Sequence, residues 1–243
     1  MATFSVAGKL RAKYDDYYDG TITEWRRLGA IGKADNIVAL CREHPHATVL
    51  EVGFGDGAIL RRLEGLGFGE AMHGLEISSS GLEAIRRDPV RLLVEARLFN
   101  GYDIPYADCA FDLAILSHVV EHVEHPRRLL NEVGRVAAHV FVEVPLEDGA
   151  RLARDFEPNE EGHINFYSEK TIRLLLQTCG LQILSTAVTN PSLAMYRSQY
   201  GTKGVVRYLV KGAALKTVPA IAKWMFTYHC SLLCKTLPRV AIA

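Results

Sequence analysis

Three glycines stand at alternate positions directly after a short apolar run: Gly53, Gly55 and Gly57. This spacing allows a tight turn with positive φ angles and a close approach of the backbone to a ligand. Together with Ala58 the stretch satisfies a loose Gly-x-Gly-x-x-Ala dinucleotide fingerprint, which is a weak signal by itself. A strand-to-helix turn without a ligand is the structural alternative. Glu51, two residues before the first glycine, favours an ammonium group over a pyrophosphate, because like charges repel.

Two histidines are candidates for acid–base chemistry. His122 opens a segment of helical period, and His163 lies in the stretch Glu161-Gly-His-Ile-Asn-Phe-Tyr167. Histidine titrates near neutral pH, which suits a general base that accepts a hydroxyl proton. The structural alternatives are a buried, helix-capping His122 and a His163 that only ties its loop to the core. His118 is expected to line a pocket. No set of histidines and acids has metal-site spacing, so we expect no metal.

The elements that must position these residues alternate along the chain. Strands are predicted at residues 47–53, 71–77, 94–99, 111–116, 139–144 and 181–188, and helices at 58–66, 78–87, 126–136 and 168–179. This alternation predicts an α/β fold with a Rossmann-like, doubly wound, mostly parallel sheet. Such sheets bind ligands at the carboxyl ends of their strands, near the switch point. The functional residues are therefore expected just after the first five strands.

Four stretches occur in the order found in a known superfamily. The segment Glu51–Gly57 resembles the acid-x-Gly-x-Gly-x-Gly motif of the class I S-adenosylmethionine-dependent methyltransferases, and residues 73–78 resemble their second-strand motif. Residues 98–112 and 116–126 are similar to the third and fourth motifs of the superfamily. The resemblance covers residues 45–190 and is specific for the superfamily but not for the acceptor. It implies S-adenosylmethionine as the cofactor of a small-molecule methyltransferase.

The resemblance also assigns cofactor contacts. They are Glu51, Gly53, Gly55, Gly57, Glu76, Ile77, Asn100, Gly101 and Ser117. Glu76 matches the acid that holds both ribose hydroxyls, and an ionised carboxylate can accept from two hydroxyls at once. The sequence departs from the superfamily where an aspartate usually contacts the adenine amino group, because Asn100 stands there. The Asn100 amide oxygen can still accept that hydrogen bond, and Asp103 is the alternative.

Methyl transfer from a sulfonium is a displacement in which the protein chiefly supplies alignment. A hydroxyl acceptor benefits from a base, whereas a carboxylate or a free amine needs little base catalysis. The two candidate histidines therefore favour methylation at oxygen, and similar methyltransferases often carry a histidine at the position of His163. A nicotinamide-dependent oxidoreductase and a non-catalytic, cofactor-binding partner protein are the alternative functions.

The segments before and after the core are predicted to form a lid and an insertion. Residues 1–45 are predicted to form a helical lid, in which Tyr14, Tyr17 and Tyr18 resemble aromatics that close over the site; residues 46–190 form the cofactor-binding core. Residues 191–243 are predicted as a basic helical insertion followed by an antiparallel strand at 237–243. Helical spacing assigns Lys203, Arg207 and Lys211 to one face, and Val206, Leu209, Val210 and Ala213 to the other.

Charge is unevenly distributed. Residues 1–169 carry all 28 acidic residues and a net charge of −10, whereas residues 170–243 carry ten Lys and Arg and no acid. The basic end is either a structural cap or a contact for an anionic partner. We expect a small-molecule acceptor, with an anionic or lipid-linked acceptor, peripheral membrane contact and a homodimer left open. No nucleic-acid methylation motif is present. The absence of a signal-peptide-like or membrane-spanning apolar run predicts a cytoplasmic protein.

Overall fold

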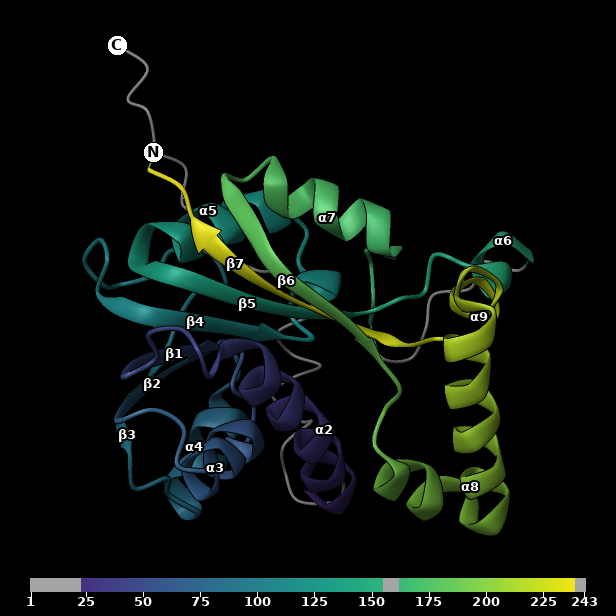
Figure 1. Ribbon diagram of the computed structural model, residues 1–243. Helices are drawn as coiled ribbons and strands as arrows, with labels where there is room; N and C mark the ends of the chain where they lie inside the picture. Colours follow the sequence, from purple (N-terminus) through teal and green to yellow (C-terminus); the bar gives the residue numbers. More distant parts are fainter. Residues whose placement is uncertain (1–22, 155–161, 239–243) are drawn as a thin grey trace.

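The computed structural model describes residues 23–154 and 162–238, and the three tyrosines of the predicted lid lie outside these ranges. A seven-stranded sheet forms the centre of the molecule, in the order β3-β2-β1-β4-β5-β7-β6 (Figure 1). The strands are β1 Thr48–Val52, β2 Ala71–Glu76, β3 Leu93–Leu98, β4 Phe111–Ser117, β5 Ala137–Pro145, β6 Leu181–Thr189 and β7 His229–Thr236. Only β7 pairs antiparallel, with β5 on one side and β6 on the other.

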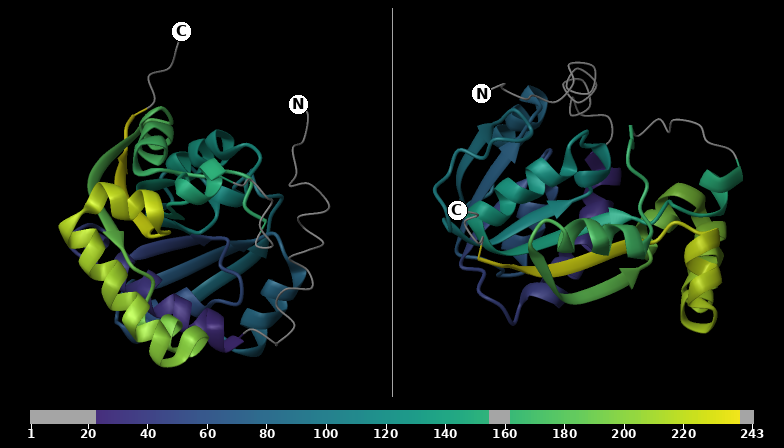
Figure 2. Two further views of the ribbon diagram at one scale, coloured as in Figure 1. Left: turned by 90° about the vertical axis from the view of Figure 1, so that its right-hand side faces the viewer. Right: turned by 90° about the horizontal axis from the view of Figure 1, so that it is seen from above.

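Helices cover both faces of this sheet (Figures 1 and 2). They are α2 Thr23–Cys41, α3 Ala58–Gly65, α4 Ser79–Arg87, the 3-10 helix η1 Val120–His122, α5 Pro126–Val136, α6 Ala150–Arg154, α7 Glu169–Gln177, α8 Leu193–Thr217 and α9 Pro219–Met225. One apolar cluster packs α2, α3 and α4 on one face, and another packs α5 and α7 on the other. The predicted doubly wound fold with an antiparallel strand near the C-terminus is confirmed.

Local sequence explains where several helices begin. The Ser78 side chain accepts a hydrogen bond from the Gly81 amide and caps α4, as the serine run predicted. Pro126 stands at the first position of α5, where its missing N–H costs no helical hydrogen bond. Ser168 and Thr171 form a reciprocal capping box at the start of α7. These caps fix the directions in which the helices leave the strand ends.

The antiparallel strand lies earlier in the chain than we predicted. The prediction of a strand at 237–243 is wrong, because the antiparallel strand is β7, and residues 239–243 lie outside the described part of the chain. Residues Cys230–Cys234 are all buried, since helices cover both faces of β7. A strand that is buried on both faces is a continuous apolar run, which periodicity alone does not distinguish from a buried helix. The insertion before it comprises α8 and α9.

The packing of α8 differs from the prediction at Lys211 and at the apolar residues, whereas Lys203 and Arg207 are exposed as predicted. Lys211, which we expected on a solvated basic face, is 7% exposed, whereas Val206 and Leu209 are each 61% exposed. The Lys211 ammonium donates to the Tyr196 hydroxyl at 2.5 Å and to the Thr227 carbonyl at 2.7 Å. It also lies over the rings of Tyr196 and Tyr228. A non-helical residue, Gly201, kinks the helix. Among the described helices, none combines the length and apolarity needed to cross a membrane.

Lys211 is therefore expected to stabilise the fold. We predict that Lys211→Ala lowers the free energy of unfolding by about 2–3 kcal/mol, because it removes hydrogen bonds from a charged group and two cation–π contacts. The exposed Lys203→Ala is the matched control and should change this free energy by less than about 0.5 kcal/mol. Urea denaturation of both variants measures the difference. Equal effects of the two substitutions would contradict an anchoring role for Lys211.

Candidate active site

The glycine loop joins β1 to α3 at the carboxyl edge of the sheet. Gly53, Gly55 and Gly57 have φ angles of 77°, 59° and 79°, so the predicted positive φ angles are confirmed. A Cβ on Gly53 would lie 2.8 Å from the Val119 side chain, and one on Gly57 would lie 2.7 Å from Ile85. Glycine is therefore needed at these two positions both for backbone conformation and for close packing. The loop therefore packs against Val119, which precedes η1, and against α4.

Glu76 closes this loop from the end of β2. Its carboxylate accepts hydrogen bonds from the backbone amides of Gly55 at 2.8 Å, Ile77 at 2.8 Å and Ser78 at 3.0 Å. The side chain is almost fully buried. The sequence pattern indicated a ligand contact and missed this structural role, which spans two strand ends. The ribose contact predicted for Glu76 and Ile77 stays a prediction.

Glu51 has an unsatisfied carboxylate oxygen at the end of β1. The residue is 1% exposed, and its Oε2 has no hydrogen-bond partner among the described residues. Burial raises the pKa of Glu51 well above its usual range, although the nearby Lys33 partly opposes this shift. A buried acceptor without a donor favours a ligand that brings a positive charge. The amino group of S-adenosylmethionine has that chemistry, so the residues present fit the cofactor.

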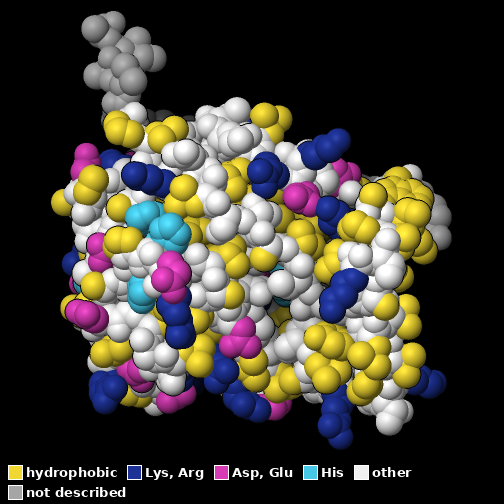
Figure 3. Space-filling view, viewed as in Figure 1, with side chains coloured by type: hydrophobic (Ala, Val, Ile, Leu, Met, Phe, Trp, Pro, Cys, Tyr) yellow, Lys and Arg dark blue, Asp and Glu magenta, His cyan; other side chains and the backbone are white. Residues whose placement is uncertain are grey.

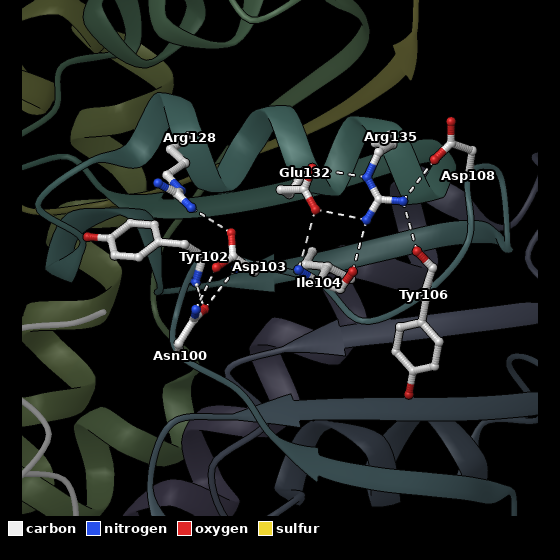
Figure 4. Close-up of polar contacts among 9 residues, drawn as sticks. All are labelled: Asn100, Tyr102, Asp103, Ile104, Tyr106, Asp108, Arg128, Glu132 and Arg135. Carbon is white, nitrogen blue, oxygen red and sulfur yellow. Dashed lines mark hydrogen bonds and ion pairs between the residues drawn. The ribbon is translucent and has the colours of Figure 1, made fainter. Parts of the chain in front are cut away.

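The loop after β3 carries the predicted adenine contacts. The Asn100 amide oxygen accepts from the backbone amides of Tyr102 at 2.9 Å and Asp103 at 2.8 Å, and its nitrogen donates to the Asp103 carboxylate at 2.6 Å (Figure 4). Asp103 also accepts from Arg128 of α5 at 2.6 Å. Gly101 has a φ of 89° and allows the tight turn. Asn100 and Asp103 therefore shape this loop, and adenine recognition by either stays a prediction.

Arg135 of α5 fixes the rest of the same loop. Its guanidinium donates to the carbonyls of Ile104 at 2.9 Å and Tyr106 at 2.8 Å, and to the carboxylates of Asp108 and Glu132, both at 2.8 Å (Figure 4). The planar guanidinium carries five N–H donors, so it can donate to several acceptors that lie around it. Sequence reasoning missed Arg135, because one arginine on an amphipathic helix carries no functional signal. Its contacts keep the loop after β3 in place.

A histidine in an unusual conformation follows β4. His118 has a φ of 58°, a left-handed conformation that non-glycine residues rarely adopt. Its Nδ1 lies 3.1 Å from a Glu121 oxygen and its Nε2 lies 3.4 Å from a Glu143 oxygen. Burial and Lys33 oppose protonation, but the two carboxylates outweigh them and raise the pKa of His118. His118 is thus held between two acids instead of only lining a pocket.

Glu143 is a fully buried acid in the middle of the sheet. Its Oε2 accepts from Asn36 of α2 and from Ser231 of β7, each at 2.7 Å, and Ser117 lies 3.4 Å from its Oε1. His229, the first residue of β7, lies 3.6 Å from the same Oε1. Burial alone would raise the pKa of Glu143, but the neighbouring histidines and Ser231 lower it to about 2. The sequence analysis missed Glu143 and His229; the signal for Glu143 was an acid in an apolar strand.

The two candidate bases lie together. The rings of His122 and His163 are 4.7 Å apart, with an angle of 72° between their planes. The His122 Nδ1 lies 3.2 Å from the Gly162 carbonyl, and the His163 Nδ1 lies 2.6 Å from a Glu147 carboxylate oxygen. Burial lowers the pKa of His122, which keeps the ring neutral near pH 7. The fold therefore joins two histidines that are 41 positions apart in the chain.

Some of these groups are close enough to share a cation. Within the described ranges they form two sets, His118 with Glu143 and His229, and Glu121 with His122 and His163. In each set the ligand atoms lie within 4.8 Å of one another. Imidazole and carboxylate donors suit transition metals, and the same donors can hold protons. The sequence spacing did not indicate either set, because their members come from separate strand ends. The expectation of no metal stays a prediction.

Comparisons with known proteins place this site in context. A family model described as a methyltransferase domain matches residues 25–186. The mitochondrial ubiquinone biosynthesis O-methyltransferase of Candida albicans is 33% identical over 90 residues, which cover 35% of this chain and 27% of that protein. An uncharacterised protein of Methanocaldococcus jannaschii is 22% identical over 185 residues, covering 73% and 83%. The structure of an S-adenosylmethionine-dependent methyltransferase from Aquifex aeolicus aligns with a TM-score of 0.57 at 16% identity, covering 93% and 98%.

The family match spans α2, the glycine loop, the two histidines and most of β6. The same region holds the unsatisfied Glu51 oxygen, which fits the amino group of S-adenosylmethionine. These findings do not support the alternative of a nicotinamide-dependent oxidoreductase. The chain belongs to the methyltransferase-domain family and is a class I S-adenosylmethionine-dependent methyltransferase.

Proposed function

We propose that this enzyme methylates an oxygen atom of a small-molecule acceptor and that His122 and His163 supply the base. The observation that carries the proposal is the contact between the half-buried His122 ring and the buried His163 ring, which bonds to Glu147. A hydroxyl acceptor must lose a proton during the transfer. A neutral amine or a carboxylate can attack the methyl group with a lone pair and needs little help from a base. The Candida albicans relative, named as an O-methyltransferase, supports the same choice.

S-adenosylmethionine, when bound, supplies a methyl group that its sulfonium charge has already activated. The chain's own residues then have to bind the cofactor and align the acceptor. We assign the ammonium end to Glu51, whose buried oxygen needs a donor, and the ribose end to Glu76. The loop Gly53–Gly57 and the Arg135 contacts keep these two acids and Asn100 at fixed positions.

The hydrogen bonds of the two histidines define which nitrogen takes the proton. The Gly162 carbonyl can only accept, so His122 carries its proton on Nδ1 when neutral, and Nε2 is the basic atom. His163 donates from Nδ1 to the Glu147 carboxylate, which fixes the ring and leaves Nε2 as its acceptor atom. The role of Glu147 is thus to position His163. We assign acceptance of the hydroxyl proton to an Nε2 atom of one of these two histidines.

Removal of the base should reduce turnover without loss of cofactor binding. We expect His122→Ala or His163→Ala to lower kcat by roughly 10²–10⁴ with S-adenosylhomocysteine affinity unchanged. His44→Ala, at the opposite end of β1, is the matched control and should keep full activity. Acceptors are screened first with labelled cofactor, and calorimetry then measures the affinity. Full activity in both site variants would point to an acceptor that needs no base.

The pH dependence gives a second readout of the same proposal. A base works in its neutral form, so kcat should rise with pH through the pKa of the base and level off. For His122 that inflection should lie below 6.5, because burial lowers its pKa. The inflection should disappear in the variant that lacks the base. Activity that falls with a chelator and returns with Zn²⁺ or Mn²⁺ would instead assign the histidines to a cation.

The ribose assignment has its own test. Glu76→Ala should weaken S-adenosylhomocysteine binding by about tenfold to a hundredfold, because a charged hydrogen-bond acceptor contributes roughly 1.5–3 kcal/mol. Glu83→Ala, an exposed acid on α4, is the control and should leave the dissociation constant unchanged. Thermal unfolding shows whether each variant is folded, since Glu76 also holds the glycine loop. An unchanged dissociation constant in folded Glu76→Ala would refute the ribose contact.

A further inference from the structure

The two helices between β6 and β7 expose apolar side chains at helical spacing. On α8 and on α9 these side chains recur at positions i, i+3 and i+4, which share one side of a helix. They are Val206, Leu209 and Val210 on α8, each at least 54% exposed, and Ile221, Trp224 and Met225 on α9, each at least 56% exposed. Figure 3 shows hydrophobic side chains gathered over this end of the molecule. We call these six residues the α8–α9 face.

Packing on the rest of the protein does not account for this face. The two helices contact the body through their other side, where Gly204, Lys211 and Ala222 are buried. A helix on the surface of a soluble protein normally buries its apolar residues and exposes its lysines. Here a lysine is inside and the aliphatic residues are outside. Contiguous exposed apolar residues of this kind mark an interaction site.

Basic residues border the apolar stripe on both sides. At 3.6 residues per turn, Lys203 and Arg207 lie along one flank of the stripe on α8, and Lys216 lies along the other. All three are exposed. No acidic residue follows Glu169 anywhere in the sequence. The partner that fits this face is apolar in its interior and negatively charged at its surface.

The segment that carries this face is inserted at the carboxyl edge of the sheet. Since β6 is parallel to β5, its end at Thr189 lies on the carboxyl edge of the sheet, and α8 leaves from there (Figures 1 and 2). The return strand begins with His229, which lies beside Glu143 and His118. Helix α8 therefore begins, and α9 ends, at the edge of the sheet that carries the candidate active site.

We propose that the α8–α9 face docks this enzyme on a lipid bilayer that contains anionic lipids. Apolar side chains flanked by Lys and Arg are the pattern of helices that lie in the membrane interface. A second copy of the chain fits less well, because a symmetric dimer through this face would bring the two basic flanks together. The inference does not depend on which acceptor atom is methylated.

Vesicle co-sedimentation tests the proposal. The full chain should pellet with phosphatidylcholine vesicles that contain phosphatidylserine, less with phosphatidylcholine alone, and less as the salt concentration rises. Leu209→Gln with Trp224→Gln should weaken partitioning by about tenfold or more. Lys203→Gln, Arg207→Gln and Lys216→Gln together should weaken it by about a hundredfold. These side chains are exposed, so melting temperature and S-adenosylhomocysteine affinity should stay unchanged.

Matched controls distinguish vesicle binding through this face from nonspecific binding to vesicles. Val94→Gln with Leu174→Gln removes two equally exposed apolar side chains elsewhere, and Arg42→Gln, Arg86→Gln and Arg87→Gln remove three exposed charges. Both controls should bind vesicles as the unchanged protein does. Equal losses in the controls, or no binding of the unchanged protein to phosphatidylserine vesicles, would overturn the proposal. A dimer in light scattering that dissociates in Leu209→Gln with Trp224→Gln, without vesicle binding, would assign the face to a second copy.

Discussion

A single buried carboxylate, Glu143, is the constraint on which the arrangement of the site depends. An isolated charge at this depth would be strongly unfavourable, so the surrounding elements have to bring donors to it. Helix α2 brings Asn36, the end of β4 brings Ser117, the next residue is His118, and β7 brings Ser231. Burial alone would raise the pKa of Glu143, but His118, His229 and Ser231 lower it to about 2. The contacts also join elements that are distant in sequence. The carboxyl edge of the sheet is thereby held in one arrangement.

The parts of the structure that local sequence controls could be predicted, and the parts that depend on distant contacts could not. The glycine loop, the Ser78 cap and the start of α5 at Pro126 follow from residues within one turn of the feature. The group around Glu143 joins residues 107 and 88 positions away, Asn36 and Ser231, and no spacing rule connects them. The strand β7 was misplaced because burial on both faces removes the period of two on which strand prediction relies.

The burial of Lys211 and the exposure of the apolar residues of α8 show a further limit of periodicity. Residues at positions i, i+4 and i+8 share a helix face, but the pattern does not say which face packs inward. Two tyrosines and a backbone carbonyl surround the buried Lys211 ammonium, and these contacts offset the cost of burying its charge. A charged residue was therefore assigned to solvent although it anchors the helix. Charge counts along a chain predict solvent exposure poorly where aromatic rings can receive a cation.

The position of β7 has a consequence for how the chain folds during synthesis. This strand pairs with both β5 and β6, although it follows α8 and α9 in sequence. As the ribosome extends the chain, β5 and β6 are complete while the strand that belongs between them is still missing. Two open strand edges, each able to pair with the wrong neighbour, must persist until residues 229–236 emerge. Until then Glu143 also lacks its hydrogen bond from Ser231. The pairing of β7 therefore closes the gap between β5 and β6 and completes the hydrogen bonding of the Glu143 carboxylate.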